Sequence, residues 1–186
     1  MTDLLSILSI AREGTSVNSS GEASLSATAK SRLQAMMGDN PMVSFAVLCV
    51  AAAGQGQAKM EKAYADYEDT TDYYKDVNKY AQEAAEKQRD ADDQDKATSM
   101  SAGMIAFCDN NNIGYSTKGG DKKHNEDEWQ SLRDGLDSEK NIASTDMKMA
   151  GAKFDQAAKD CDSAQQMAVD CVKKNTDVFG TLAKTL

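Results

Sequence analysis

The residue types that most often carry out chemistry are sparse in this chain. A catalytic triad needs a histidine beside its nucleophile, and the single histidine, His124, lies in a loop rich in lysine and asparagine. We expect it at the surface. Acidic residues are abundant, but none stands in an apolar setting that would raise its pKa for acid–base catalysis. The chain is therefore predicted not to be an enzyme, and an enzyme built on the middle of the chain is the least favoured alternative.

Metal ligands are not arranged in a recognised pattern either. Residues 109–120 begin like a calcium loop, but Ile113 and Gly120 stand at two positions where oxygen ligands are required. A structural zinc site needs four ligands, and Cys108 and His124 are the only soft ligands nearby. We therefore expect no metal and no cofactor.

Two long segments repeat apolar or small residues in alternating steps of three and four. The first seam is Met42, Ala46, Cys49, Ala53, Gly56, Met60, Ala63, Tyr67, Thr70, Tyr74, Val77, Ala81, Ala84, Gln88 and Ala91. The second seam is Ala143, Met147, Ala150, Phe154, Ala157, Cys161, Ala164, Ala168, Cys171, Asn175, Val178 and Leu182. This spacing is the heptad pattern of left-handed coiled coils, in which seam residues pack into a partner helix. The chain must therefore fold back on itself, bind other chains, or both.

Composition favours long helices over a compact core. Hydrophobic residues make up 40% of the chain, aromatic residues only 6%, and there is a single proline to interrupt a helix. We expect an all-α fold in which two long antiparallel coiled-coil helices, residues 41–97 and 127–186, flank a small irregular middle segment, residues 98–126. Residues 1–40 are expected to be a flexible N-terminal segment for export or assembly.

Local signals refine this outline. Residues 12–30 are polar and predicted to lack regular structure, whereas 27–37 could form a short helix and the middle segment a short hairpin. Gly54 and Gly56 weaken the first long helix or permit very close backbone approach. An interruption of the second long helix is expected near Gly135 and Asn141, before the second seam starts at Ala143.

Polar and thiol residues on the seams have two interpretations each. Three of the four cysteines lie there and are expected to pack as small apolar side chains. Cys161 and Cys171 are about 15 Å apart on one helix and cannot pair with each other, but a disulfide between helices or between chains remains open. Asn175 either fixes the register of the coiled coil or is a polar residue tolerated near a helix end.

Charge and hydropathy limit the partners and the route of export. The net charge of −9 argues against nucleic acid, because phosphate binding needs basic clusters. The most apolar run, residues 42–53, is shorter than the ~20 residues needed to span a bilayer, so stable membrane insertion is not expected. Asp3 stands where a signal peptide would be basic, and no small-residue cleavage site follows, so we expect no cleaved signal peptide.

Three stretches occur in an order that matches a known group of proteins. Asn40-Pro41 and the apolar run 42–53 lead through Gln55 and Gln57 into a long polar helix. The other two stretches are residues 105–113 and residues 129–137, the latter followed by 144–147. From about Asn40 to the C-terminus, this layout resembles the EspA/SseB/EseB-type filament proteins of type III secretion systems.

The resemblance implies an exported subunit that polymerises into a hollow filament on the bacterial surface and links the secretion needle to the host membrane. The partners implied are other copies of the chain, the needle, the pore-forming translocator proteins, and a dedicated cytoplasmic chaperone that covers the seams before export. The middle segment would be variable and face outward. The candidate subunit or chaperone contacts are Met42, Cys49, Met60, Tyr67, Tyr74, Val77, Met147, Phe154, Cys161, Cys171, Asn175, Val178 and Leu182.

A second class of function fits the same pattern. A seam of this kind could also belong to a protein that does not polymerise, either a secreted helical tip or translocator protein or an intracellular coiled-coil binding protein. Such a protein would form a discrete monomer or a small oligomer.

Overall fold

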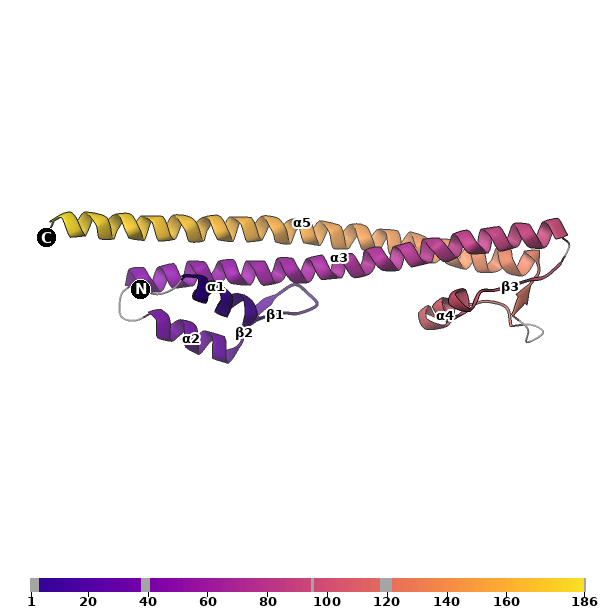
Figure 1. Ribbon diagram of the computed structural model, residues 1–186, viewed down its shortest axis with the longest axis horizontal. Helices are drawn as coiled ribbons and strands as arrows, with labels where there is room; N and C mark the ends of the chain where they lie inside the picture. Colours follow the sequence, from indigo (N-terminus) through magenta and orange to yellow (C-terminus); the bar gives the residue numbers. More distant parts are fainter. Residues whose placement is uncertain (1–3, 38–40, 95, 118–121, 186) are drawn as a thin grey trace. The chain divides into compact units, whose positions relative to one another are not determined.

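The computed structural model describes residues 4–37, 41–94, 96–117 and 122–185, which are almost entirely helical (Figure 1). The elements in order are α1 (Leu4–Glu13), β1 (Thr15–Val17), β2 (Ala23–Leu25), α2 (Ala27–Met37), α3 (Pro41–Gln94), β3 (Thr98–Ser99), α4 (Ala102–Asn111), β4 (Lys123–His124) and α5 (Glu126–Thr185). The all-α fold with two long helices is confirmed.

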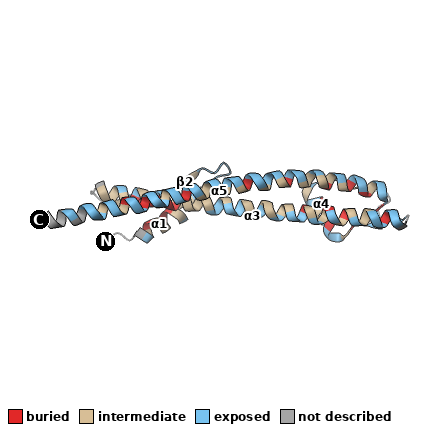
Figure 2. Cartoon of the chain, turned by 90° about the horizontal axis from the view of Figure 1, so that it is seen from above, coloured by how far each residue is buried: buried red, intermediate tan, exposed pale blue. Residues whose placement is uncertain are grey.

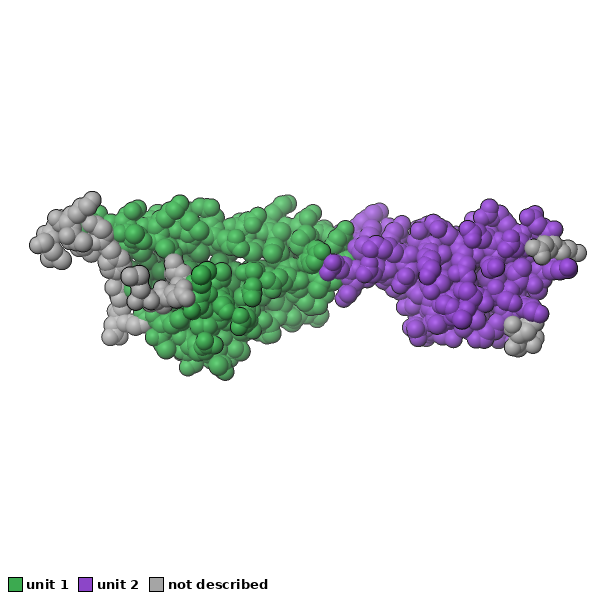
Figure 3. Space-filling model, in the orientation of Figure 1, with its two compact units in different colours: residues 1–67, 150–186 green, residues 68–149 purple. Residues whose placement is uncertain are grey.

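The chain forms two compact units, and α3 and α5 contribute residues to both (Figure 3). Unit 1 consists of residues 1–67 and 150–186, and unit 2 of residues 68–149. Each unit has its own cluster of buried apolar side chains. The two units are described separately below.

In unit 1, α3 and α5 pack side by side in opposite directions. Near the start of α3, the Asn175 side chain of α5 donates a hydrogen bond of 2.9 Å to the main-chain oxygen of Met42. Further along α3, the Tyr64 ring lies 5.5 Å from the ring of Phe154, which comes earlier in α5. Residues later in α3 therefore contact residues earlier in α5, which establishes that the two helices are antiparallel.

The same helices pair antiparallel in unit 2. The Tyr73 hydroxyl donates a hydrogen bond of 2.7 Å to Glu139, and the Gln88 side chain donates one of 2.8 Å to Gln130. Again the later residue of α3 meets the earlier residue of α5. The antiparallel pairing expected from the sequence is therefore found in both units.

The seams form the interior of these pairs (Figure 2). Every residue of the first seam is buried or half-buried, and so is every residue of the second seam from Ala143 to Asn175. Val178 departs from the pattern, with 42% of its surface exposed. Because Asn175 already reaches the first turn of α3, no further turn of α3 remains to cover Val178.

The N-terminal part of unit 1 carries more regular structure than the sequence indicates. Between α1 and α2, a stretch predicted to lack regular structure forms an antiparallel hairpin in which Thr15 pairs with Leu25 and Val17 with Ala23. The helix predicted at residues 27–37 is confirmed as α2. Apolar side chains from α1, α2 and α3 form one buried cluster that includes Ile7, Leu33 and Val47.

A small folded head joins α3 to α5 in unit 2. The expected short hairpin is present as β3 paired with β4, but the head also contains α4, which the sequence did not predict. Its side chains Met104 and Cys108 are fully buried, together with Trp129 of α5. The middle segment therefore supplies part of the core of unit 2.

Polar caps fix where the helices of this head begin and end. The Ser101 side chain accepts a hydrogen bond from the Met104 main-chain N–H, and Asn112 ends α4 in the left-handed conformation. Asn125 and Glu128 cap α5 reciprocally, each side chain accepting a hydrogen bond from the other residue's main-chain N–H. The prediction of an interruption near Gly135 and Asn141 was wrong, because α5 continues through both residues.

Gly54 tests the close packing of α1 on α3. A Cβ atom at Gly54 would lie 2.7 Å from the Cβ of Ala11 and 2.8 Å from the main-chain oxygen of Leu8, so Gly54→Ala must displace α1. We expect a net loss of about 1–2 kcal/mol of unfolding free energy, because this overpacking outweighs the gain in helix propensity. Thermal unfolding followed by circular dichroism measures it.

Gly151→Ala is the matched control on α5. Its Cβ would approach the Tyr67 ring no closer than 3.4 Å, which is an ordinary contact. This variant should be as stable as the wild type, or more stable by up to about 1 kcal/mol. Equal stability of the two variants would contradict the tight docking of α1.

Candidate interaction surface

Small residues bring the two long helices of unit 1 unusually close together. A Cβ atom at Gly56 would lie only 3.3 Å from the Cα of Cys161, so a larger residue at Gly56 would push α5 away. Further along the pair, the ring of Tyr67 is stacked on the ring of Phe154, with centroids 6.4 Å apart and an interplanar angle of 12°. The expectation that glycine permits close backbone approach is confirmed for Gly54 and Gly56.

Asn175 is anchored rather than merely tolerated. Its side-chain nitrogen donates to the main-chain oxygen of Met42 across the seam, at 2.9 Å. A half-buried amide with a specific partner favours one register of α3 against α5, because any slip would leave the amide without that partner. Of the two interpretations of Asn175, the structure supports the register role.

The cysteines are free thiols packed inside the fold. Burial raises the pKa of Cys108 to about 11, and burial also raises the pKa of Cys161. Burial, together with contact with Cys171, raises the pKa of Cys49 to about 11. These three thiols are therefore protonated at neutral pH and pack as small apolar side chains, which agrees with the prediction and disfavours nucleophilic catalysis.

Aromatic side chains pack α4 against α3 in unit 2. The Phe107 ring of α4 lies 4.8 Å from the ring of Tyr80 and 6.0 Å from the ring of Tyr73. Burial raises the pKa of Tyr73, and the hydrogen bond from its hydroxyl to Glu139 raises it further. Val77, one turn away on the seam, is completely buried. These residues hold the head against α3.

The thirteen predicted contact residues therefore lie mostly between the helices of this chain. All of them up to Asn175 are buried or half-buried, Val178 is exposed, and the side chain of Leu182 is outside the described residues. Contact of these residues with a second subunit or a chaperone stays a prediction. In the monomer, the seams are closed by pairing with each other.

The sequence reasoning missed apolar side chains that the chain leaves exposed. The described large hydrophobic residues with exposed surface are Leu5, Phe45, Leu48, Tyr64, Ile142, Met149, Met167, Val169 and Val178. Most of them belong to unit 1. Phe45 and Leu48 are 60% and 54% exposed, and with the exposed Ala52 they follow steps of three and four along α3. We call these three residues the outer stripe.

The signal for the outer stripe was present in the sequence. Residues 42–53 carry no charge at all, so they are apolar around the whole helix rather than on one face. Only one side of this run can face α5, and Val47 and Val50 belong to the buried cluster to which α1 and α2 contribute. The remaining side is the outer stripe.

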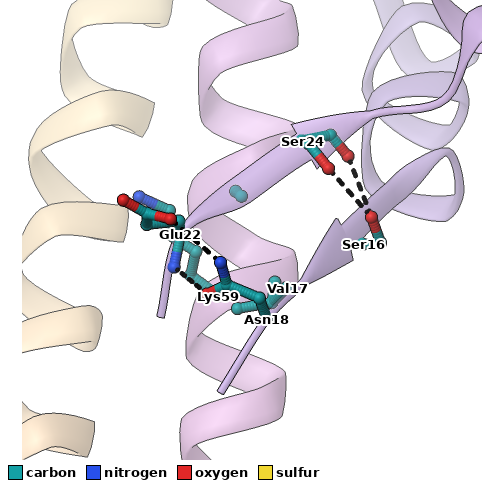
Figure 4. A pocket seen from close by; sticks show the side chains of 7 residues that line it. Ser16, Val17, Asn18, Glu22, Ser24 and Lys59 are labelled. Atoms are coloured by element: carbon teal, nitrogen blue, oxygen red, sulfur yellow. Dashed lines mark hydrogen bonds between the residues drawn. The ribbon is translucent and has the colours of Figure 1, made fainter. Parts of the chain in front are cut away.

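The hairpin of unit 1 borders an open polar hollow beside α3, with a volume of about 650 Å³ (Figure 4). Its polar side chains bond mainly to one another: the Ser16 and Ser24 hydroxyls are 3.0 Å apart, and Asn18 donates to Glu22 at 2.9 Å. Lys59 of α3 closes one side. These internal bonds give the hollow a structural role in holding the hairpin turn.

His124 was predicted at the surface, and this was wrong. Pairing of β4 with β3 places its ring in the core of unit 2, fully buried and 5.0 Å from the ring of Trp129. Its Nδ1 lies 3.3 Å from the main-chain oxygen of Lys122, and among the described residues its Nε2 has no hydrogen-bond partner. The ring packs between Trp129 and Tyr115, whose ring lies 6.3 Å away.

Among the residues that the structure describes, no three His, Cys, Asp or Glu side chains gather closely enough to hold a metal ion. None of the described helices combines the length and the apolar character needed to cross a membrane.

No family model, curated protein or solved structure matches this chain. The contacts, burial and exposed side chains of the chain itself are therefore the basis for assigning a function. The resemblance noted in the sequence adds an expectation about the kind of assembly.

Asn175→Ala tests the polar anchor of the seam. Removing the amide leaves the packing of small residues intact but breaks the bond to Met42, so we expect a loss of about 1 kcal/mol in unfolding free energy. Thr176→Ala is the matched control, because the exposed Thr176 hydroxyl bonds only within its own helix, to Val172. In denaturant unfolding, the control should lose no more than about 0.5 kcal/mol of unfolding free energy. Equal effects would contradict the register role.

Proposed function

We propose that this chain is a structural subunit of an extracellular type III secretion filament, and that it assembles with further copies of itself. The observation that carries the proposal is the outer stripe of α3, together with the other exposed apolar side chains of unit 1. Exposed apolar groups at successive helix turns are typical of protein–protein contact sites. Steps of three and four suit a helix as the partner.

The remaining features support a structural role over catalysis. The buried thiols are protonated, the one histidine is in a hydrophobic core, and the hollow beside the hairpin is lined by groups that bond each other. Two long helices that already cover each other's seams present a rigid surface to a neighbouring subunit. The proposal of a type III secretion filament, rather than another polymer, comes from the resemblance to filament proteins. The proposed contacts with the needle, the translocator proteins and the chaperone come from the same resemblance.

Leu48→Asp tests the outer stripe as a subunit contact. Leu48 is 54% exposed, so the aspartate stays hydrated in the monomer but would lose water between subunits. We expect concentrated wild-type protein, freed of any co-purified chaperone, to form long hollow filaments in negative-stain electron microscopy. The variant should remain as discrete particles with an unchanged helical circular dichroism spectrum.

Gln82→Asp is the control, since it also adds one negative charge at an exposed position of α3 but lies outside the stripe. It should still form filaments. Filaments from Leu48→Asp would contradict the role of the stripe. Discrete particles from the wild type itself would overturn the polymer and favour the tip or binding-protein alternative.

A further inference from the structure

Cys49 and Cys171 come from opposite helices, and the register of unit 1 places them face to face. A Cβ atom at Gly56 would lie 3.7 Å from the Cβ of Ala164, so these two positions oppose each other. Cys49 precedes Gly56 by one heptad along α3, and Cys171 follows Ala164 by one heptad along α5. Because facing positions in an antiparallel coiled coil recur every heptad, Cys49 opposes Cys171.

The proximity of the two thiols agrees with this register. Burial raises the pKa of the Cys49 thiol, and the neighbouring Cys171 raises it further. The hydrogen bond from Asn175 to the oxygen of Met42 holds the register one turn beyond Cys171. The approach of Gly56 to Ala164 on one side and the Asn175–Met42 hydrogen bond on the other therefore bracket the cysteine pair and fix the register of the two helices there.

The spacing suits a covalent bond between the helices. Disulfides need a Cβ–Cβ distance of roughly 3.5–4.5 Å. One heptad away, a Cβ atom built at Gly56 would lie 3.7 Å from the Cβ of Ala164, so at that turn the two helices approach each other to within this range. The other cysteines do not compete, because Cys161 is about 15 Å from Cys171 along the same helix. Cys108 is fully buried in the core of unit 2.

We propose that Cys49 and Cys171 form an intrachain disulfide that joins α3 to α5 when the protein meets a low-molecular-weight disulfide such as glutathione disulfide. The half-buried Cys49 reacts first: its thiolate attacks one sulfur of glutathione disulfide and releases one glutathione thiolate. The Cys171 thiolate then attacks the Cys49 sulfur and releases the second. The two cysteines lose two protons and two electrons, and glutathione disulfide is reduced to two glutathione molecules.

This bond would close a loop of about 120 residues and prevent the helices of unit 1 from separating at this point. In a reducing compartment the pair stays open, and in an oxidising one it closes. The inference does not depend on the proposed filament, because it concerns contacts within one chain.

Peptide mapping of the wild-type chain tests the disulfide without any substitution. Full-length protein, purified reduced, is incubated with excess glutathione disulfide at pH 8.5, where more thiolate is available. Remaining thiols are then alkylated, and the unreduced digest is analysed by mass spectrometry. The expected result is a linked peptide pair containing Cys49 and Cys171, with the other two cysteines alkylated. Four alkylated thiols, stable glutathione adducts, or links between chains would each overturn the proposal.

Matched variants give a second readout. We expect oxidised wild-type protein to melt about 5–15 °C above the reduced form, because the cross-link restricts the unfolded chain. Cys161→Ala, at another buried seam position of α5, should keep this difference, whereas Cys49→Ala should lose it. A difference that persists in Cys49→Ala would contradict the assignment.

Discussion

The close approach of α3 and α5 is the constraint on which the other features depend. Small residues line the seams, and at Gly56 the α3 main chain lies almost against the Cα of Cys161. Alanine and glycine bury little apolar area per residue, so such a pair gains stability only by extending over many turns. Larger apolar side chains are added where other elements join, around Ile7 and Val47 in unit 1 and around Trp129 in unit 2.

Because the two seams pack against each other within one chain, most seam residues are not accessible for contacts with other chains. Side chains that a heptad pattern would assign to a partner are already covered, and a partner could reach them only by separating the helices. The surface left over is the outer side of α3 and parts of α5, where Phe45 and Met167 remain exposed. An assembly of intact subunits must therefore use residues outside the seams, whatever role the seams have before the subunit folds.

Features that depend on a long repeating pattern could be predicted from the sequence, whereas features that depend on contacts between distant residues could not. Heptad spacing is a long, redundant signal, and it located both long helices and the residues between them. The hairpin around Thr15 was missed because three-residue strands are too short to show an alternating pattern. The burial of His124 depends on a tertiary contact with Trp129, which a polar local sequence does not reveal. Gly135 interrupts no helix because buried Leu132 and Leu136 hold both of its flanks.

The surface could be predicted less well than the interior, and the reason is physical. The residues of a seam can be recognised from their periodic spacing. Whether an apolar residue stays exposed depends instead on which helices pack over it, and for α3 this is determined by the packing of α1, α2 and α5 around it. The run 42–53 illustrates this, because its lack of charge is equally compatible with complete burial. The structure divides the run among three environments: Cys49 faces α5, Val47 faces the N-terminal helices, and Phe45 faces solvent. The uncharged run 42–53 thus packs against α5 on one side and against the N-terminal helices on another, and its third side stays exposed. On that third side a further helix could bury the exposed side chains of Phe45 and Leu48.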